Sequence, residues 1–298
     1  MKKLKFILIL IITVILCGCK TEQTSKKDGD TEAETIEFDE LKQELRDVYY
    51  RFPSPAEMFS YLDSTGLRFD KKLLSLRRNA DDYLTTRDQA LNLGVYIADL
   101  AYISLFQRYK ESIDYLQIIY KLSDKLRISA AFDKDLIYRI EKNIKNTDSL
   151  EVISDIALTN IIRYLSRNEK EDVFALISVG GFIEFMNISM LSANDYTVDN
   201  IIVKKIAEQK IVYENILKFA CQYAGNNKNV DDVLELIHPL TVFFNQLKTE
   251  TKQTTVSKSD EGKLVFGGGT RILLFKDEFD QLKEIILLIR SKIISADL

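Results

Sequence analysis

Residues 85–106, TTRDQALNLGVYIADLAYISLF, decide the fold class of this chain. Thr85 and Asp88 form a loose capping box, the pattern in which side chains satisfy the free backbone N–H groups at a helix start. Apolar residues then recur at spacings of three and four, which predicts a helix whose buried face holds Leu91, Val95, Ala98 and Leu105. Glycine is unfavourable inside a helix, so Gly94 indicates a place where another backbone or side chain approaches closely.

The same kind of pattern continues along most of the chain, which contains only three prolines and eleven glycines. The stretch SPAEMFSYL gives a helix start, with Ser54 as the cap, Pro55 in the first helical position and Glu57 completing a capping box. Further helices are expected near residues 112–126, 133–144, 149–165, 171–191, 198–224 with a break near Lys210, 231–247 and 277–294. The sequence therefore predicts an all-α fold, either a multi-helix bundle or an irregular helical array.

One stretch near the C-terminus departs from helical spacing. Residues 254–275 hold short β-branched runs, separated by the turn formers of residues 260–262 and by the triple glycine 267–269. This pattern predicts a small β-hairpin or a three-stranded ribbon. The triple glycine is interpreted as a turn, because it is followed by no Gly-Lys-Ser or Gly-Lys-Thr of a phosphate-binding loop.

Two short segments resemble each other across the helical part. Residues 93–97, LGVYI, and residues 179–183, VGGFI, each lie in the middle of a long apolar helix. Gly180 and Gly181 thus have the same significance as Gly94, a close approach to a neighbouring element. Duplication and chance similarity both remain open, and the spacing matches no repeat type with a fixed period.

The first twenty residues, MKKLKFILILIITVILCGCK, have the form of an export signal, with a basic start followed by an apolar run too short to span a membrane. The letters Leu16-Cys17-Gly18-Cys19 resemble the lipobox of bacterial lipoproteins. The resemblance implies a signal peptide over residues 1–18 and acyl chains, such as palmitate, on Cys19. The alternatives are an ordinary secretory signal cleaved nearby and an N-terminal anchor helix.

The segment after the signal bears on location. Residues 19–35 lack large apolar side chains apart from Cys19, so we expect a disordered tether. Two or three acyl chains would hold the protein firmly on a membrane. Lys20 is not the Asp that commonly retains lipoproteins in the inner membrane, so the resemblance implies the outer membrane of a Gram-negative cell, facing the periplasm or the outside. Residues 36–298 are expected to form one helical domain, or two packed subdomains at 36–168 and 169–298.

Composition limits the classes of partner. Removal of residues 1–18, which hold three lysines and no acid, changes the formal net charge from −4 to −7. A mildly acidic domain lacks the clustered basic residues that nucleic-acid binding requires, so no nucleic-acid partner is expected. Cys221 is then the remaining thiol, and its apolar neighbours predict burial.

The sequence contains few candidate catalytic or metal-binding residues. His238 is the single histidine, which excludes metal sites that need two histidine ligands. It precedes Pro239 on an apolar helix, where we expect a partly buried imidazole at a kink. No catalytic set, metal site or cofactor site is predicted.

Acidic residues within apolar helices are the strongest site candidates. Asp99 has Tyr96 and Tyr102 three positions to either side, and Glu184 shares a helical stripe with Asn187. If the two helices face each other, these residues form a polar patch that could bind a cation or a polar ligand, or act in acid/base chemistry. The alternative is that each acid bonds a tyrosine or a helix end and only fixes packing.

The sequence of the mature chain resembles an uncharacterised family of helical lipoproteins. Three segments carry the resemblance, YRFPSPAEMFSYL (50–62), LTTRDQALNLGVYIADLAY (84–102) and KIAEQK (205–210). That resemblance implies no activity. Two functional hypotheses follow. The first is a membrane-anchored, non-catalytic binding or scaffold domain, with an envelope protein or a small envelope ligand as its partner. The alternative is an envelope hydrolase or ligand-processing enzyme that uses buried carboxylates.

Overall fold

The computed structural model describes residues 53–296, except residues 64, 66, 77–79, 133–137, 140–141, 143–146, 194–195, 198 and 259–263. Residues 47–298 form one compact unit, separate from residues 1–46. The expected signal peptide, Cys19 and the expected tether therefore lie outside the described residues, as does most of the helix expected at 133–144. The subdomain division at residues 168 and 169 stays a prediction.

The described part confirms the all-α prediction, because it contains eight α-helices and one two-stranded sheet. The helices are α3 (Pro55–Asp63), α4 (Thr86–Leu105), α5 (Tyr109–Lys125), α7 (Thr147–Arg167), α8 (Glu171–Ser192), α9 (Ile201–Ala220), α10 (Lys228–Gln246) and α11 (Lys276–Ser295). Three short 3-10 helices connect some of them, namely η1 (Lys71–Leu73), η3 (Ser129–Ala131) and η4 (Cys221–Tyr223).

Capping residues fix several helix starts. The hydroxyl of Ser54 accepts the backbone N–H of Glu57 at 3.2 Å, and the hydroxyl of Thr85 accepts that of Asp88 at 3.0 Å. Both starts agree with the capping patterns in the sequence. The break expected near Lys210 was wrong, because α9 runs without interruption from Ile201 to Ala220.

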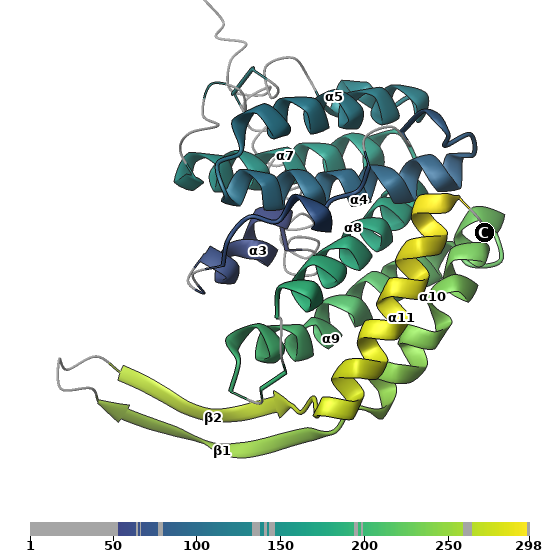
Figure 1. Ribbon diagram of the computed structural model, residues 1–298. Helices are drawn as coiled ribbons and strands as arrows, with labels where there is room; N and C mark the ends of the chain where they lie inside the picture. The colour runs from purple at the N-terminus through teal and green to yellow at the C-terminus, as the bar shows by residue number, and fades with distance from the viewer. Residues whose placement is uncertain are drawn as a thin grey trace, which may run out of the picture. The chain divides into compact units, whose positions relative to one another are not determined.

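The sheet is a single antiparallel hairpin of β1 (Thr249–Lys258) and β2 (Leu264–Ile272). The interpretation of Gly267–Gly269 as a turn was wrong, because these glycines lie inside β2. The register shifts between Lys252, which pairs with Gly269, and Thr255, which pairs with Gly267. A glycine in a strand interior commonly marks such a bulge. The hairpin extends away from the helices (Figure 1).

Helix α8 is the centre of the core. It crosses α4, and α9 and α11 pack against it, while α5 covers another side of α4 (Figure 1). Among the described residues α8 alone is long and apolar enough to span a membrane, yet 89% of its apolar window is buried inside the unit. Its composition is thus that of a core helix, which is apolar on all sides because it is surrounded by protein.

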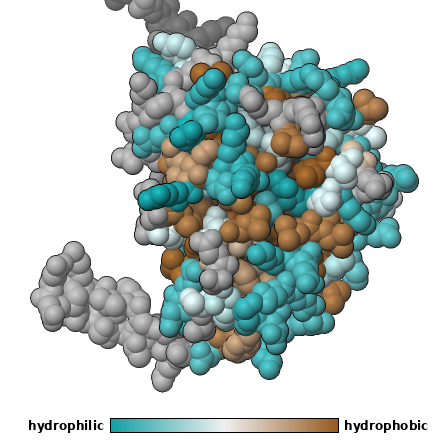
Figure 2. All heavy atoms as spheres, viewed as in Figure 1, coloured by the Kyte–Doolittle hydropathy of each residue, from teal (hydrophilic) through white to brown (hydrophobic). Residues whose placement is uncertain are grey.

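Hydrophilic side chains cover much of the face in Figure 2, with apolar side chains gathered in a band across its middle.

Two sequence expectations about burial were wrong. Cys221 is exposed, because it begins η4 just past the buried end of α9. His238 is also exposed, and α10 continues through Pro239 with the imidazole on its outer face.

Candidate functional site

The contact between α4 and α8 is close enough to exclude side chains. A Cβ atom added at Gly94 would lie 2.0 Å from the carbonyl oxygen of Ile177, and one added at Gly180 would lie 1.9 Å from that of Leu91. Gly181 has more room, because its nearest neighbour would be the oxygen of Gly94 at 3.4 Å. The glycines allow the two backbones to touch, which places the side chains beyond the crossing next to one another.

Asp99 of α4 lies beside this crossing and is fully buried, with an exposed fraction of 0%. Its Oδ2 atom accepts the backbone N–H of Ser75 at 3.1 Å, from the loop that follows η1. Its Oδ1 atom has no hydrogen-bond donor among the described residues. Glu184 is the neighbouring charged group on α8.

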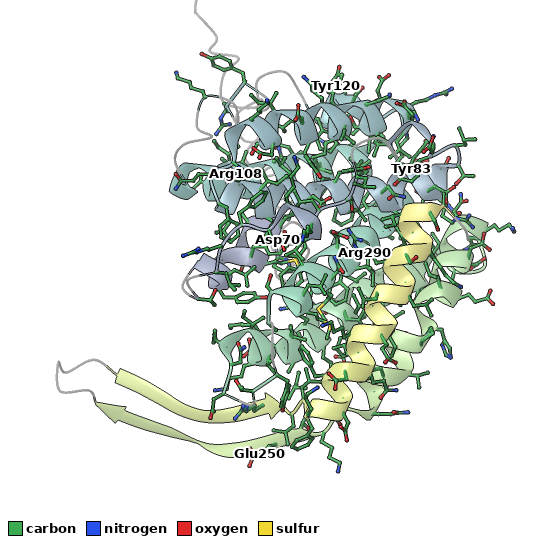
Figure 3. The ribbon with its side chains drawn as sticks, in the orientation of Figure 1. Asp70, Tyr83, Arg108, Tyr120, Glu250 and Arg290 are labelled. Carbon is green, nitrogen blue, oxygen red and sulfur yellow. The ribbon has the colours of Figure 1, made fainter. Side chains whose placement is uncertain are left out.

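Glu184 is also fully buried and is paired with Arg290, which reaches it from α11 (Figure 3). The Arg290 Nη2 atom donates to Glu184 Oε1 at 2.8 Å, and Nε donates to Oε2, so the pair is bidentate. Arg290 Nη2 also donates to Ser75 Oγ at 3.0 Å. The bidentate geometry is the strong form of a carboxylate–guanidinium contact. One cation thus joins α8, α11 and the loop that holds Asp99.

Ionisation of both buried carboxyl groups beside a single cation is unfavourable, because their negative charges repel each other. Burial raises the pKa of Asp99 well above its usual value, and the nearby charge of Glu184 raises it further. Burial also raises the pKa of Glu184, whereas Arg290 and Asp99 lower it. Because Arg290 neutralises Glu184, we infer that Asp99 is the acid that keeps its proton at neutral pH. We refer to Ser75, Asp99, Glu184 and Arg290 as the acid–arginine cluster.

The other residues of the predicted patch lie near this cluster without completing a site. The Tyr96 hydroxyl donates to the Leu76 carbonyl at 2.9 Å, and the Tyr102 hydroxyl accepts the Asp70 N–H at 3.1 Å. Asn187 approaches Glu184 Oε1 at 3.5 Å, a long contact, and its Oδ1 atom has no partner among the described residues. The tyrosines therefore hold the segment around η1 against α4. In these two contacts the hydroxyl groups bind backbone atoms, not the side chains of Asp99 or Glu184.

Sequence reasoning identified the two acids but missed Arg290 and Ser75. Arg290 stands in the run IILLIRSKII, residues 285–294, and a cation next to these apolar residues was an available signal. Ser75 gave none, because its role depends on a loop whose path local patterns do not fix. Among the described residues no group of three or more His, Cys, Asp and Glu side chains is arranged to hold a metal ion.

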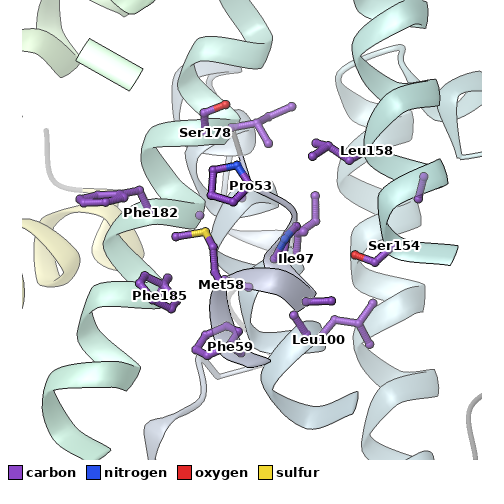
Figure 4. Close-up of a pocket in the computed structure, with 18 of the residues that line it drawn as sticks. Pro53, Met58, Phe59, Ile97, Leu100, Ser154, Leu158, Ser178, Phe182 and Phe185 are labelled. Atoms are coloured by element: carbon purple, nitrogen blue, oxygen red, sulfur yellow. The ribbon is translucent and has the colours of Figure 1, made fainter. Parts of the chain in front are cut away.

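A second feature lies on another side of the same two helices. It is a cavity of about 410 Å³ between α3, α4, α5, α7, α8 and α9. Figure 4 shows side chains of α7 facing those of α8 across it, with Met58 and Phe59 from α3 between them. Its size falls within the range of small-molecule pockets, about 300–1,000 Å³.

The cavity wall is apolar and carries no charged side chain among the described residues. Its polar side chains are four serines, Ser60, Ser104, Ser154 and Ser178. Neither Asp99 nor Glu184 belongs to the wall, although Ala98 and Phe185 next to them in sequence do. The α4–α8 pair thus separates an ionic side from an apolar one.

Comparison with known proteins gave no matching family model, no matching curated protein and no matching solved structure.

Proposed function

We propose that this chain is a lipid-anchored envelope protein of the outer membrane, attached through Cys19, whose folded unit is a non-catalytic binding domain. The cavity between α3, α4, α5, α7, α8 and α9 is the binding site. The observation that carries this proposal is the cavity itself, with its volume of about 410 Å³ and a mostly apolar wall in which no described residue is charged. A concave, mostly apolar site of this size is typical of pockets that bind small molecules, which supports a ligand in this cavity.

The burial of the two acids weighs against the alternative of a hydrolase. A catalytic carboxyl group must come within hydrogen-bond distance of its substrate. Asp99 and Glu184 have exposed fractions of 0%, and neither lines the cavity. Their hydrogen bonds to Ser75 and Arg290 instead join three parts of the fold. We assign the acid–arginine cluster to the architecture of the binding domain.

The test is binding of an uncharged, environment-sensitive dye, Nile red, to the mature chain with Cys19→Ser. Ala157→Phe, on α7, places a ring in the cavity, and we expect it to abolish the fluorescence increase. Ala224→Phe is the matched control, because Ala224 is exposed and lies outside the cavity wall. Denaturant midpoints show whether each variant remains folded. Equal dye binding by the wild type and by folded Ala157→Phe would reject the cavity as the site.

A further inference from the structure

We infer that the cavity selects an uncharged molecule with one long apolar chain and a hydroxyl or carbonyl group, and that Ser104 and Ser154 recognise that polar group. This inference rests on the proposed function and names the ligand class of the same site. Three observations carry it, namely the size of the cavity, the lack of charge in its described wall and the state of its four serine hydroxyls.

The size sets the length of the apolar part. A cavity of 150 Å³ lined by apolar side chains holds benzene, with six carbon atoms, so by proportion about 410 Å³ holds on the order of 16 such atoms. That is the scale of one acyl or alkyl chain. It is too little for a lipid with two full-length chains.

The wall residues determine whether the part of the ligand inside the cavity can carry a charge. A charged group moved from water into an apolar site without a partner is strongly disfavoured. No lysine, arginine, aspartate or glutamate is among the described wall residues, so a carboxylate or an ammonium group would find no counter-charge there. Arg290, the cation of the acid–arginine cluster, is bound to Glu184 and is not part of the wall.

The serines set the polar group. Ser60 and Ser178 donate within their own helices, to the carbonyl oxygens of Glu57 and Phe174, each at 2.8 Å. Ser104 on α4 and Ser154 on α7 make no side-chain hydrogen bond to any described residue, and Figure 4 shows the Ser154 hydroxyl directed toward the space between the helices. A hydroxyl can both donate and accept, so these two serines suit an alcohol or a carbonyl group.

The experiment compares the dodecyl series as competitors of Nile red on the mature chain with Cys19→Ser. Dodecan-1-ol should displace the dye, whereas dodecanoate and dodecyltrimethylammonium should require at least about tenfold higher concentrations, because each brings an unpaired charge. If either charged competitor displaces the dye at less than about tenfold the concentration of dodecan-1-ol, the inference is overturned and the binding function stays intact. Failure of Nile red itself to bind would instead reject the proposed function.

A second measurement separates recognition from simple partitioning. Ser104→Ala with Ser154→Ala removes two hydroxyls and keeps the wall apolar, so the dodecan-1-ol affinity should fall by about 3- to 10-fold, as for one lost hydrogen bond. Dodecane, which has no polar group, is the matched control and should bind the variant as well as it binds the wild type. An equal loss for both compounds, or no loss for the alcohol, would overturn the role of the two serines.

Discussion

Gly94 and Ile177 touch through their backbones: a Cβ atom at position 94 would lie 2.0 Å from the Ile177 carbonyl oxygen and 2.6 Å from the Gly181 nitrogen. No flexible side-chain end can move away to relieve that overlap, because both neighbours are backbone atoms. Together with Gly180, Gly94 allows this contact because neither residue has a Cβ methyl group. Both the acid–arginine cluster and the cavity border this contact.

Gly94→Ala and Gly180→Ala should each destabilise the fold by about 1–3 kcal/mol or more, since the methyl group forces the two helices apart. Gly181→Ala is the matched control, because its Cβ atom would meet the nearest backbone at 3.4 Å and helix propensity favours alanine. Urea midpoints with unchanged slopes measure the effect. Stabilisation by alanine at position 94 or 180 would contradict the close crossing.

Glu184→Gln should destabilise the protein by about 3–5 kcal/mol, because it leaves the guanidinium of Arg290 partly buried without its counter-charge. Asp99→Asn replaces a carboxyl group that we infer to be protonated with a neutral group of the same shape. It should therefore not lower the free energy of unfolding at neutral pH, and it should raise it, because the variant no longer has to take up a proton on folding. Thermal and urea unfolding of both variants at the same pH make the comparison. Similar large losses in both would show that Asp99 is ionised.

The pH dependence of stability should carry the signature of Asp99. The unfolded chain releases this proton near pH 4, about the usual aspartate value, whereas burial raises the pKa of Asp99 in the folded protein. Between the two values the folded state binds more protons. The free energy of unfolding therefore falls as pH rises, by up to about 1.4 kcal/mol per pH unit from this group.

Asp99→Asn removes that contribution, so the variant should gain stability relative to the wild type as pH increases from about 5 to 8. Urea titrations across this range measure the difference. A constant difference between the two proteins would contradict a raised pKa for Asp99.

Arg290→Met and Glu184→Leu should each cost several kcal/mol on their own, because each leaves one member of the ion pair without its counter-charge. The double variant should be more stable than either single one, since it removes both charges and keeps apolar volume in the core. A double-mutant cycle on denaturant midpoints gives the coupling energy. Strict additivity of the two single effects would show that the pair contributes nothing to the α8–α11 contact.

Cys19→Ala should prevent acylation and leave the precursor uncleaved after residue 18, because it removes the thiol of the lipobox-like sequence. Cys17→Ala is the matched control and should be acylated normally. Metabolic labelling with a fatty-acid analogue, followed by gel analysis, distinguishes the two. Equal labelling of the wild type and Cys19→Ala would reject the lipoprotein assignment.

Local patterns in the sequence predicted much of the fold, because helices are encoded by spacings of three and four and by caps such as Thr85. The glycine argument also succeeded at Gly94, where a costly residue inside an apolar helix indicated close packing. The same reasoning failed at Gly267–Gly269, because glycine permits both a turn and a bulged strand and only the pairing with β1 decides between them.

The rest of the site depends on contacts between residues far apart in sequence. The acids could be identified from their apolar surroundings, but the partner of Glu184 is Arg290, 106 positions later. The exposure of Cys221 depends on the exact end of α9, which sequence patterns place only within a few residues. The cavity could not be predicted, because it is what remains after six helices have packed, and no single segment encodes it.

The last helix of the described chain is bound to some of the earliest. The Tyr83 hydroxyl donates to the carbonyl of Ile294 at 3.2 Å, and Asn92 Nδ2 donates to that of Ile293 at 2.9 Å. α4 therefore has all of its neighbours only after α11 has been synthesised, and a chain that stops before Arg290 lacks the cation that pairs with Glu184. We therefore expect a chain truncated before α11 to be less stable and more sensitive to proteases than the full chain, since Glu184 would be buried without its counter-charge.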